Sequence, residues 1–387
     1  MGTDVSDFSK KYSKKGEMAD SNLVMPGSVS ITLRGFPNGL HGGWGVEYNF
    51  RPVPVETRYG TNPHQQFAFY KPQGMKTHLG DMEVHKLGKE GFSKTNLQDM
   101  SQAISMLKYL DETGCVILKH LMPCGFSYGT KAVEAYEKAL AGDPIAAFGG
   151  TVGFNTIVDE EAAEKIMRLF TENVVALGYT EGALQALRQN EGTKKLNHAV
   201  RVVSVADMCT LPRFWGDDVK NYLTIQTLPT GELTVEIPYL SGVRSVEDFI
   251  IDPEVAGVAA QRAPTSQELT DALLSWRLVA QTRSNAVIAV RGGRTIGIGE
   301  GQPDRVGAVE QAIDKARRFG FNLEGAVLAS DAFFPKRDSI DYAGRAGVKA
   351  IVWPAGSKGD KEIIAAANEY GMAMMVPKTG ERCFLHV

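Results

Sequence analysis

The chain has 387 residues, enough for two or three domains of about 150 residues each. Its 42 Lys and Arg residues against 45 Asp and Glu residues leave a formal net charge of -3, which excludes a general electrostatic attraction to nucleic acid or to an anionic membrane. Any anionic ligand must therefore be bound by a few Lys or Arg side chains at specific positions. Hydrophobic residues make up 43% and charged residues 22%, which is typical of a globular protein and excludes a disordered or fibrous one.

The lack of targeting signals and the spacing of the cysteines both indicate a cytoplasmic location. No apolar stretch approaches the roughly 18 residues of a membrane helix, and the polar start lacks the apolar run of a secretory signal. The four cysteines, which have neither disulfide nor metal-ligand spacing, are Cys115, Cys124, Cys209 and Cys383. We therefore expect a cytoplasmic protein with no membrane and no nucleic-acid partner.

The first part of the chain divides into two regions. Residues 1–55 are polar and rich in glycine, and we interpret them as an irregular N-terminal arm. Residues 56–189 have an α/β pattern. Helical spacing predicts helices near 96–110, 131–140 and 160–170, and short apolar runs predict strands at CVILK, AFGGTVGF and VVAL.

The second part repeats this pattern after an interruption. Residues 190–264 hold shorter β-like runs and are interpreted as a connector or small insertion. In residues 265–387, Thr265 and Glu268 predict a capping box, and strands and helices then alternate to the end, with one helix closed by Gly347. The fold class is therefore α/β, with two subdomains of similar build whose sheets are covered on both faces.

One candidate anion site is the glycine-rich segment TIGIGEGQPDR, which spans 295–305 and runs from a strand to a helix start. Free backbone N–H groups in such a turn suit a phosphate or a carboxylate. The dinucleotide fingerprint fails because Gln302 stands where the third glycine belongs, and no P-loop occurs. A structural glycine turn therefore stays an open alternative.

A second candidate is LKHLMPCG, at 118–125, where Lys119 and His120 end an apolar strand. The imidazole titrates near neutrality and could act as a general base, but the two side chains converge only if the strand breaks there. The alternative is an exposed Lys beside a structural His. A zinc-deaminase site fails, because Met122 stands where that pattern needs Glu and Ser127 where it needs Cys.

Three further segments carry polar and aromatic side chains. RYGTNPHQ, at 58–65, is dense in hydrogen-bond donors and suits an oxygen-rich ligand, although a plain polar loop is the alternative. SDAFFPKRDS, at 330–339, has two phenylalanines that are more often core residues than ligand contacts. RCFLH, at 382–386, suggests that the C-terminus is docked.

Taken in order, these segments together with DPIAAFGG and SNAVIAVRGGRTIGIGEGQPDR resemble the transformylase part of the AICAR transformylase/IMP cyclohydrolase family. The resemblance implies two cytidine-deaminase-like, three-layer subdomains without zinc ligands. It also implies a homodimer with shared active sites at the subunit interface. The activity it implies is formyl transfer from 10-formyltetrahydrofolate, the co-substrate, to the 5-amino group of AICAR in purine (IMP) biosynthesis, giving FAICAR.

The resemblance also assigns roles by position. Lys119 and His120 match the catalytic pair, with His120 as general base and Lys119 either as oxyanion stabiliser or as a group that helps to protonate the leaving folate nitrogen. His386 matches a C-terminal histidine that is expected near the reacting groups. The positions expected to contact the nucleotide are Arg58, Tyr59, Gly149, Glu172, Asn285, Arg305, Phe333 and Arg382. The positions expected to contact the folate are Pro335, Asp338, Pro354, Gly356 and Ser357.

Four positions depart from the family pattern: Met122, Glu172, Glu300 and Lys336. They leave an alternative open, a nucleotide-binding regulatory protein of the same fold with impaired catalysis, and a weaker one, a related enzyme with another donor or acceptor. Because few residues precede Arg58, we expect no cyclohydrolase domain. No metal site is expected, and a structural monovalent cation stays open.

Overall fold

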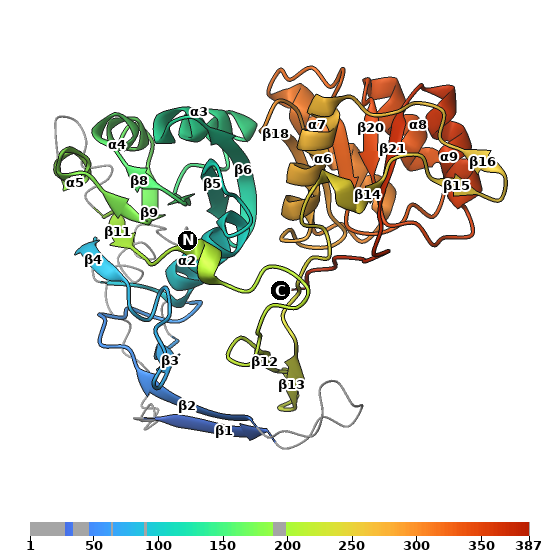
Figure 1. Cartoon of the computed structure of the whole chain (residues 1–387). Coiled ribbons are helices and arrows are strands. Elements are labelled where there is room, and N and C mark those ends of the chain that lie inside the picture. Colours follow the sequence, from blue (N-terminus) through green and yellow to red (C-terminus); the bar gives the residue numbers. More distant parts are fainter. Residues whose placement is uncertain (1–27, 34–45, 63–64, 89–90, 189–198, 387) are drawn as a thin grey trace, which may run out of the picture.

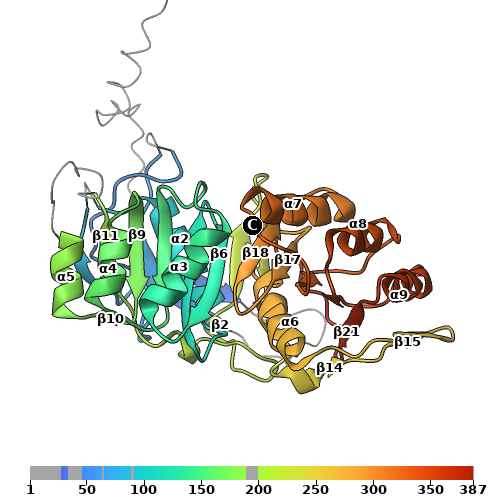
Figure 2. The same cartoon turned by 90° about the horizontal axis from the view of Figure 1, so that it is seen from above.

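The structure, a computed structural model, describes residues 28–33, 46–62, 65–88, 91–188 and 199–386. Two α/β halves lie side by side, and a small β-structure lies below the first half in Figure 1. Figure 2 shows the same two halves from above, with the strands of each sheet running between layers of helices. The expected α/β class is therefore confirmed.

The first half contains a six-stranded sheet with strand order β4-β11-β9-β7-β5-β6. Strands β11, β9 and β7 are parallel, and β4, β5 and β6 pair with their neighbours in antiparallel fashion. In chain order its strands are β4 (Glu83–Lys86), β5 (Thr113–Lys119), β6 (Met122–Gly129), β7 (Gly150–Phe154), β9 (Thr171–Ala176) and β11 (Arg201–Ser204). Two short strands, β8 (Ile157–Val158) and β10 (Gly178–Tyr179), pair beside it.

The second half contains a six-stranded sheet with order β14-β21-β20-β19-β17-β18. Here β21, β20 and β19 are parallel, and the three other strands pair in antiparallel fashion. Its strands are β14 (Phe249–Ile250), β17 (Val287–Val290), β18 (Thr295–Gly299), β19 (Val327–Ser330), β20 (Ala350–Val352) and β21 (Ala373–Pro377). Strand for strand, the two sheets therefore have the same order and the same directions.

Helices cover both faces of each sheet. On the first sheet, α2 (Lys94–Leu107) packs on one face, and α3 (Ala132–Gly142), α4 (Glu160–Ile166) and α5 (Glu181–Arg188) pack on the other. On the second, α6 (Ser266–Val279) packs on one face, and α7 (Arg305–Arg318), α8 (Asp338–Ala346) and α9 (Asp360–Glu369) pack on the other. The α2 and α6 layers share one continuous hydrophobic core.

The strand residues alternate between these layers as a period of two requires. In β17, Val287 and Ala289 pack toward α7 to α9, whereas Ile288 and Val290 pack toward α6. All four are fully buried. An uninterrupted apolar run such as VIAV is what a strand covered on both faces needs.

The two sheets meet along the edge strands β6 and β18. Ser127 and Arg294 form an antiparallel bridge, and the Phe126 amide donates to Thr295 Oγ1 at 2.9 Å. Gly125 is required here, because a Cβ at this position would lie 1.9 Å from the carbonyl oxygen of Ala139 on α3. The antiparallel meeting brings the start of β6 close to the end of β18.

The predicted arm is only partly irregular, and this corrects the sequence interpretation. Residues 1–27 and 34–45 lie outside the described residues, but β1 (Val29–Leu33) and β2 (Val46–Pro52) pair with each other and with β3 (Tyr70–Pro72). Both strands alternate apolar and polar residues, as in VSITL and VEYNF. This alternation is the β-strand pattern, and the glycines between the two strands obscured it.

The range expected as a connector also contributes to both sheets. Strand β11 belongs to the first sheet and β14 to the second, while β12 (Thr224–Thr227) and β13 (Leu233–Glu236) form the expected β-like hairpin. The short pair β15 (Glu254–Val255) and β16 (Val258–Ala259) precedes α6. Each sheet therefore extends into the 190–264 range.

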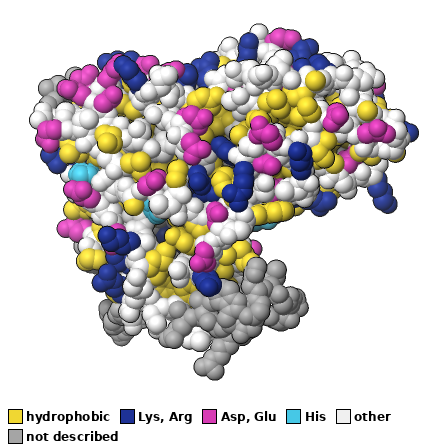
Figure 3. All heavy atoms as spheres, in the orientation of Figure 1, with side chains coloured by type: hydrophobic (Ala, Val, Ile, Leu, Met, Phe, Trp, Pro, Cys, Tyr) yellow, Lys and Arg dark blue, Asp and Glu magenta, His cyan; other side chains and the backbone are white. Residues whose placement is uncertain are grey.

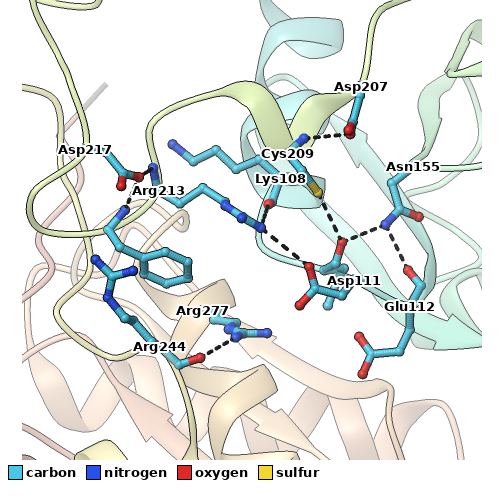
Figure 4. A network of polar contacts seen from close by, with 12 residues as sticks. Lys108, Asp111, Glu112, Asn155, Asp207, Cys209, Arg213, Asp217, Arg244 and Arg277 are labelled. Atoms are coloured by element: carbon cyan, nitrogen blue, oxygen red, sulfur yellow. Dashed lines mark hydrogen bonds and ion pairs between the residues drawn. The ribbon is translucent and has the colours of Figure 1, made fainter.

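A polar network fixes the connector against both halves (Figure 4). Arg213 donates to the Lys108 carbonyl at 3.3 Å and lies 3.5 Å from the Asp111 carboxylate, both in the first half. Arg244 accepts a hydrogen bond from Arg277 of α6 through its carbonyl at 2.8 Å. The guanidinium groups of Arg213 and Arg244 lie 5.3 and 4.9 Å from the ring of Phe214.

The helix-end signals in the second half match the sequence. Thr265 and Glu268 form the capping box that opens α6, and Gly347 ends α8 with a φ of 99°. Helix α4 is shorter than expected, because it ends at Ile166 rather than near residue 170.

Candidate active site

The Lys119–His120 pair lies at a tight hairpin. Lys119 at the end of β5 pairs with Met122 at the start of β6, so His120 and Leu121 form a two-residue turn with φ values of 56° and 68°. Two-residue hairpins favour positive φ at both turn positions, which normally selects Asn and Gly. His and Leu here carry a backbone strain of order 1–3 kcal/mol each, a feature that concentrates at functional sites. The strand break expected from the sequence is therefore present as a turn.

Asp99 of α2 holds this turn in place, a role that the sequence analysis missed. Its carboxylate accepts hydrogen bonds from the backbone N–H groups of His120 at 3.3 Å and Leu121 at 2.8 Å. Burial raises the pKa of Asp99, and the two N–H groups oppose that rise. Because the Asp99 carboxylate binds only the backbone of the turn, the His120 backbone is fixed while its imidazole stays exposed.

The His120 imidazole opens into a cavity of about 510 Å³. The cavity is lined by Arg58, Tyr59, Thr61, Ser93, Thr95, Asn96, His120, Phe170, Glu172, Ala199 and Arg201. The Arg58 guanidinium lies 4.9 Å from the centre of the Tyr59 ring, and the Tyr59 carbonyl accepts the Lys94 amide at 3.0 Å. From RYGTNPHQ, Arg58, Tyr59 and Thr61 thus line this cavity, while Pro63 and His64 lie outside the described residues.

Among the cavity residues that were not predicted as site residues are Asn96 and Arg201. Asn96 donates to the Glu172 carboxylate at 3.0 Å, and its own amide oxygen accepts from the Ser93 cap. Arg201, only 3% exposed, donates to the Gly91 carbonyl, and burial lowers its pKa while the Glu172 charge opposes that shift. The β11 register places Arg201 opposite Asn173, one residue from Glu172, but nothing local marks VRVV as part of a site.

Lys119 is oriented by the loop that precedes β7. Its Nζ donates to the Phe148 carbonyl at 2.8 Å, and the following residue, Gly149, has a φ of 74°. The Gly149 amide donates to the Phe170 carbonyl at 2.7 Å, so this loop joins Lys119 to the cavity wall. A Cβ at Gly149 would lie 3.3 Å from the Phe170 ring, which favours glycine.

A second set of predicted residues lies at the ends of β18 and β19. Arg305, 6% exposed, donates to Asn285 Oδ1 at 2.6 Å and to the Ala286 carbonyl at 3.0 Å, and it forms an ion pair with the fully buried Asp331. The hydrogen bonds and the ion pair of this guanidinium are thus formed with residues of the same chain, and they position the Asn285 side chain. The nucleotide contact that the resemblance implies for Arg305 stays a prediction.

The residues expected at the folate lie beside Arg382. The Arg382 guanidinium lies 4.8 Å from the centre of the Phe333 ring, and a Cβ at Gly356 would lie 3.7 Å from Arg382 Nη2. The Ser357 hydroxyl donates to the Phe334 carbonyl at 3.3 Å, which brings the turn of Pro354, Gly356 and Ser357 to the segment that carries Pro335 and Asp338.

The C-terminal segment is docked, as RCFLH suggested. The Ser284 amide donates to the Leu385 carbonyl at 3.0 Å, and the Ser284 hydroxyl donates to Asp331 at 2.5 Å. His386 is exposed beside this contact, with its ring 6.1 Å from that of Phe384. His386 therefore belongs to the second set.

Comparisons with known proteins were made against families and individual proteins. The model of the family described as AICARFT/IMPCHase bienzyme matches residues 47–315. This chain belongs to that family. It is 39% identical over 345 residues to the bifunctional purine biosynthesis protein PurH of Caldicellulosiruptor saccharolyticus, covering 87% of this chain and 61% of that protein. It is 37% identical over 330 residues to the PurH of Aquifex aeolicus, covering 85% and 59%. The chain thus spans about 60% of the length of these curated relatives.

Solved structures give only distant likenesses. A Thermotoga maritima diaminohydroxyphosphoribosylaminopyrimidine deaminase/reductase matches at 21% identity with a TM-score of 0.20, covering 26% of this chain and 32% of that one. A cyanophage S-TIM5 dCMP deaminase matches at 17% identity with a TM-score of 0.21, covering 28% and 92%. Neither likeness carries an argument about the site.

The family positions fall into two sets that share one side of the body. The cavity set lies where β5 ends and β7, β9 and β11 begin, and the Arg305 set lies where β18, β19 and β20 end. Because the start of β6 adjoins the end of β18, both sets face the same edge. From β9 to β19 there are six strand steps, or roughly 29 Å at the usual spacing of about 4.8 Å. At this separation, we expect that one ligand phosphate does not contact Arg58 and Arg305 of the same chain.

The four departures from the family pattern lie in different places. Met122 is 40% exposed at the hairpin, and Lys336 is exposed after Pro335. Glu172 lines the cavity. Glu300 is only 8% exposed, and its Oε2 has no hydrogen-bond partner among the described residues. Burial raises the pKa of Glu300 to about 7, against the opposing charges of Lys315 and Arg283.

The described residues were also searched for metal sites and membrane segments. They contain no group of three or more His, Cys, Asp or Glu side chains that could hold a metal ion. Within the same described ranges, no helix has both the length and the apolar character needed to cross a membrane.

Proposed function

We propose that this chain transfers a formyl group from 10-formyltetrahydrofolate to the 5-amino group of AICAR, giving FAICAR and tetrahydrofolate. The proposal includes two cytidine-deaminase-like subdomains, at 56–189 and 265–387, joined through residues 190–264. It includes a cytoplasmic homodimer that shares its active sites. Family membership and the repeated strand order of the two sheets support it.

The observation that carries the proposal is the His120–Leu121 turn. A histidine and a leucine at positive φ, fixed by a buried Asp99, have no structural reason to replace an Asn-Gly turn. The turn presents an imidazole to a cavity that also holds a guanidinium and a phenol from Arg58 and Tyr59. These groups suit a nucleotide that must lose a proton from an amine during reaction.

The chemistry assigns each group one task. The amine nitrogen of AICAR attacks the formyl carbon, a C–N bond forms, and the carbonyl electron pair moves to oxygen. His120 accepts the proton that the nitrogen loses, and the Lys119 ammonium stabilises the oxyanion. When the carbonyl re-forms, the bond to folate N10 breaks, and N10 takes a proton from the His120 imidazolium. The amine is a poor nucleophile, because its lone pair is conjugated with a carboxamide-bearing ring, so proton removal during attack is essential.

A dimer would complete this site. The cavity set and the Arg305 set of one chain lie too far apart for one substrate, yet both face one edge of the body. A second copy related by two-fold symmetry would bring its Phe333, Arg382 and folate-side turn against the first copy's His120. Two exposed apolar side chains adjoin Lys119, Met122 as its strand partner and Phe148 as the residue whose carbonyl accepts from its Nζ, as an interface or a folate ring would need.

The experiment is an assay of purified full chain with AICAR and 10-formyltetrahydrofolate. We expect tetrahydrofolate to form at a rate that depends on both substrates, above the background without AICAR. Absence of turnover at micromolar enzyme, with AICAR binding retained in calorimetry, would contradict the proposal and support the nucleotide-binding alternative. Absence of both turnover and binding would remove both readings.

A further inference from the structure

A larger cavity lies on the other side of the Tyr59–Thr61 segment. Its volume is about 1110 Å³, and it is enclosed by one face of α2, the 65–72 segment that leads into β3, and the connector around Leu211 and Tyr222. Figure 3 shows hydrophobic side chains gathered in the hollow between the β3 region and the β12–β13 hairpin. We name this cavity the α2 groove. Thr61 lines both cavities, but the groove contains none of the residues predicted to bind AICAR or folate.

The charge of the α2 groove is positive. Lys94 and Lys108 line it from the two ends of α2, about 21 Å apart at 1.5 Å per residue. Lys71 also lines it and is paired with Asp81, which does not. None of the described side chains that line the groove is Asp or Glu. Two ammonium groups thus remain without a carboxylate inside the groove.

The middle of the groove is apolar and aromatic. The side chains that line this part are Leu97 and Ile104 of α2 together with Phe67, Phe69 and Tyr222. Ser101 lies between the two α2 side chains and is exposed to the groove. Flat rings pack well between aliphatic and aromatic walls.

Of the two lysines, Lys108 is the stronger indication of an anionic ligand, because it is buried. It is 8% exposed, and its Nζ donates to the Pro212 carbonyl at 2.7 Å. Burial lowers its pKa to about 8, and the charges that face it come from the connector, with Asp217 opposing and Arg213 adding to that shift (Figure 4). A buried ammonium at the end of a groove without carboxylates is stabilised most by an anionic ligand.

We propose that the α2 groove binds an elongated organic anion that carries a flat aromatic ring, with the ring between Leu97, Ile104 and Phe69 and an anionic group at Lys108. This binding site is separate from the formyl-transfer site and does not depend on the proposed function. Two sources share this chemistry, a nucleoside polyphosphate and a pteroyl-oligoglutamate. In both, an anionic chain extends from a heterocycle, so the ring can lie in the apolar middle of the groove while the chain reaches Lys108.

The test is calorimetric titration of the full chain with ATP and, separately, with pteroyltriglutamate, each in the presence of saturating AICAR. We expect the groove to bind either ATP or a second equivalent of pteroyltriglutamate, beyond the one equivalent that the formyl-transfer site would bind, and the identity of that probe tells which source the groove accepts. Lys108→Met removes the buried cation and is expected to weaken binding about tenfold. Ser101→Trp fills the groove from an exposed helix position and should weaken it at least as much, while formyl transfer stays unchanged. Lys361→Met, an exposed lysine on α9, is the matched charge control.

The pH dependence gives a second readout. Wild-type affinity should fall as the pH rises from 7 to 9, because the Lys108 ammonium loses its proton near pH 8, and Lys108→Met should remove most of this fall. If neither probe binds with a Kd below 1 mM, the proposal is wrong. Binding that both groove variants leave unchanged would overturn it too. If Lys108→Met fails to fold, Ser101→Trp decides alone.

Discussion

Glu300, buried where the edge strands β6 and β18 meet, allows a quantitative test of how its burial affects the stability of the protein. It follows β18, its amide donates to Gln311 at 2.8 Å, and its carboxylate is buried near the start of β6. The described charges that face it are the cations Lys315 of α7 and Arg283 before β17. Neither is close enough to form a hydrogen bond with Oε2. Glu300→Gln removes the charge and keeps the shape.

The magnitude follows from the pKa. Burial raises the pKa of Glu300 from 4.5 to about 7, so between these values the folded state binds more protons than the unfolded state. The free energy of unfolding therefore falls as the pH rises through this window, and the loss is complete above pH 7. At 1.36 kcal/mol per pKa unit, a rise of about 2.5 units amounts to about 3 kcal/mol. Glu300→Gln should recover much of this at pH 8 and little at pH 4.5.

The assay is urea denaturation followed by tryptophan fluorescence at pH 4.5, 6 and 8. We expect the difference between variant and wild type to grow with pH by about 3 kcal/mol. Glu310→Gln is the matched control, since Glu310 is exposed on the same helix as Lys315. An equal effect of Glu300→Gln at all three pH values would refute the reasoning, because it would mean that the carboxyl does not titrate between the unfolded and folded pKa values.

Three further substitutions test other parts of the account. Asp99→Ala leaves two turn N–H groups without their acceptor, and urea denaturation should show a loss of about 1–3 kcal/mol while kcat falls more than KM rises; unchanged kcat would mean that the turn needs no anchor. Arg305→Met strands the buried Asp331 carboxylate and should destabilise by about 3–5 kcal/mol in the same assay, and a neutral effect would contradict the buried pair. Gly125→Val should abolish soluble folded protein, judged by gel filtration, because its Cβ has no room beside α3.

The sequence predicted much of the fold, because each half follows simple local rules. Apolar runs such as VIAV mark strands covered on both faces, and the capping box at Thr265 and the αL glycine at Gly347 mark helix ends. The repetition of one strand order in two sheets was expected only as a similarity of build. It emerges from pairing between strands far apart in the chain, which local patterns do not encode.

The residues of the candidate site that stand in recognisable motifs were predicted from the sequence. The residues that only support them were not. His120 and Arg58 stand in recognisable segments, so the sequence identified them. Asp99, Asn96 and Arg201 lie in an ordinary helix and an ordinary strand, and only the packing of α2 and β11 brings them to the cavity. Residues that act through backbone N–H groups leave no mark in a single sequence.

The position of β11 explains why its place in the first sheet was not predicted from the sequence. Only four residues long, β11 follows the 189–198 range, which lies outside the described residues, and it is parallel to β9. A short strand that enters a sheet far from its neighbours in sequence has no turn signal beside it.

The central claim is that His120 removes a proton from the amine of AICAR during formyl transfer. The measurement is kcat for tetrahydrofolate formation by wild type and His120→Ala, beside the AICAR dissociation constant of both from calorimetry. The account predicts a loss in kcat of about a hundredfold or more with nearly unchanged AICAR affinity. A variant that keeps the wild-type kcat would contradict it.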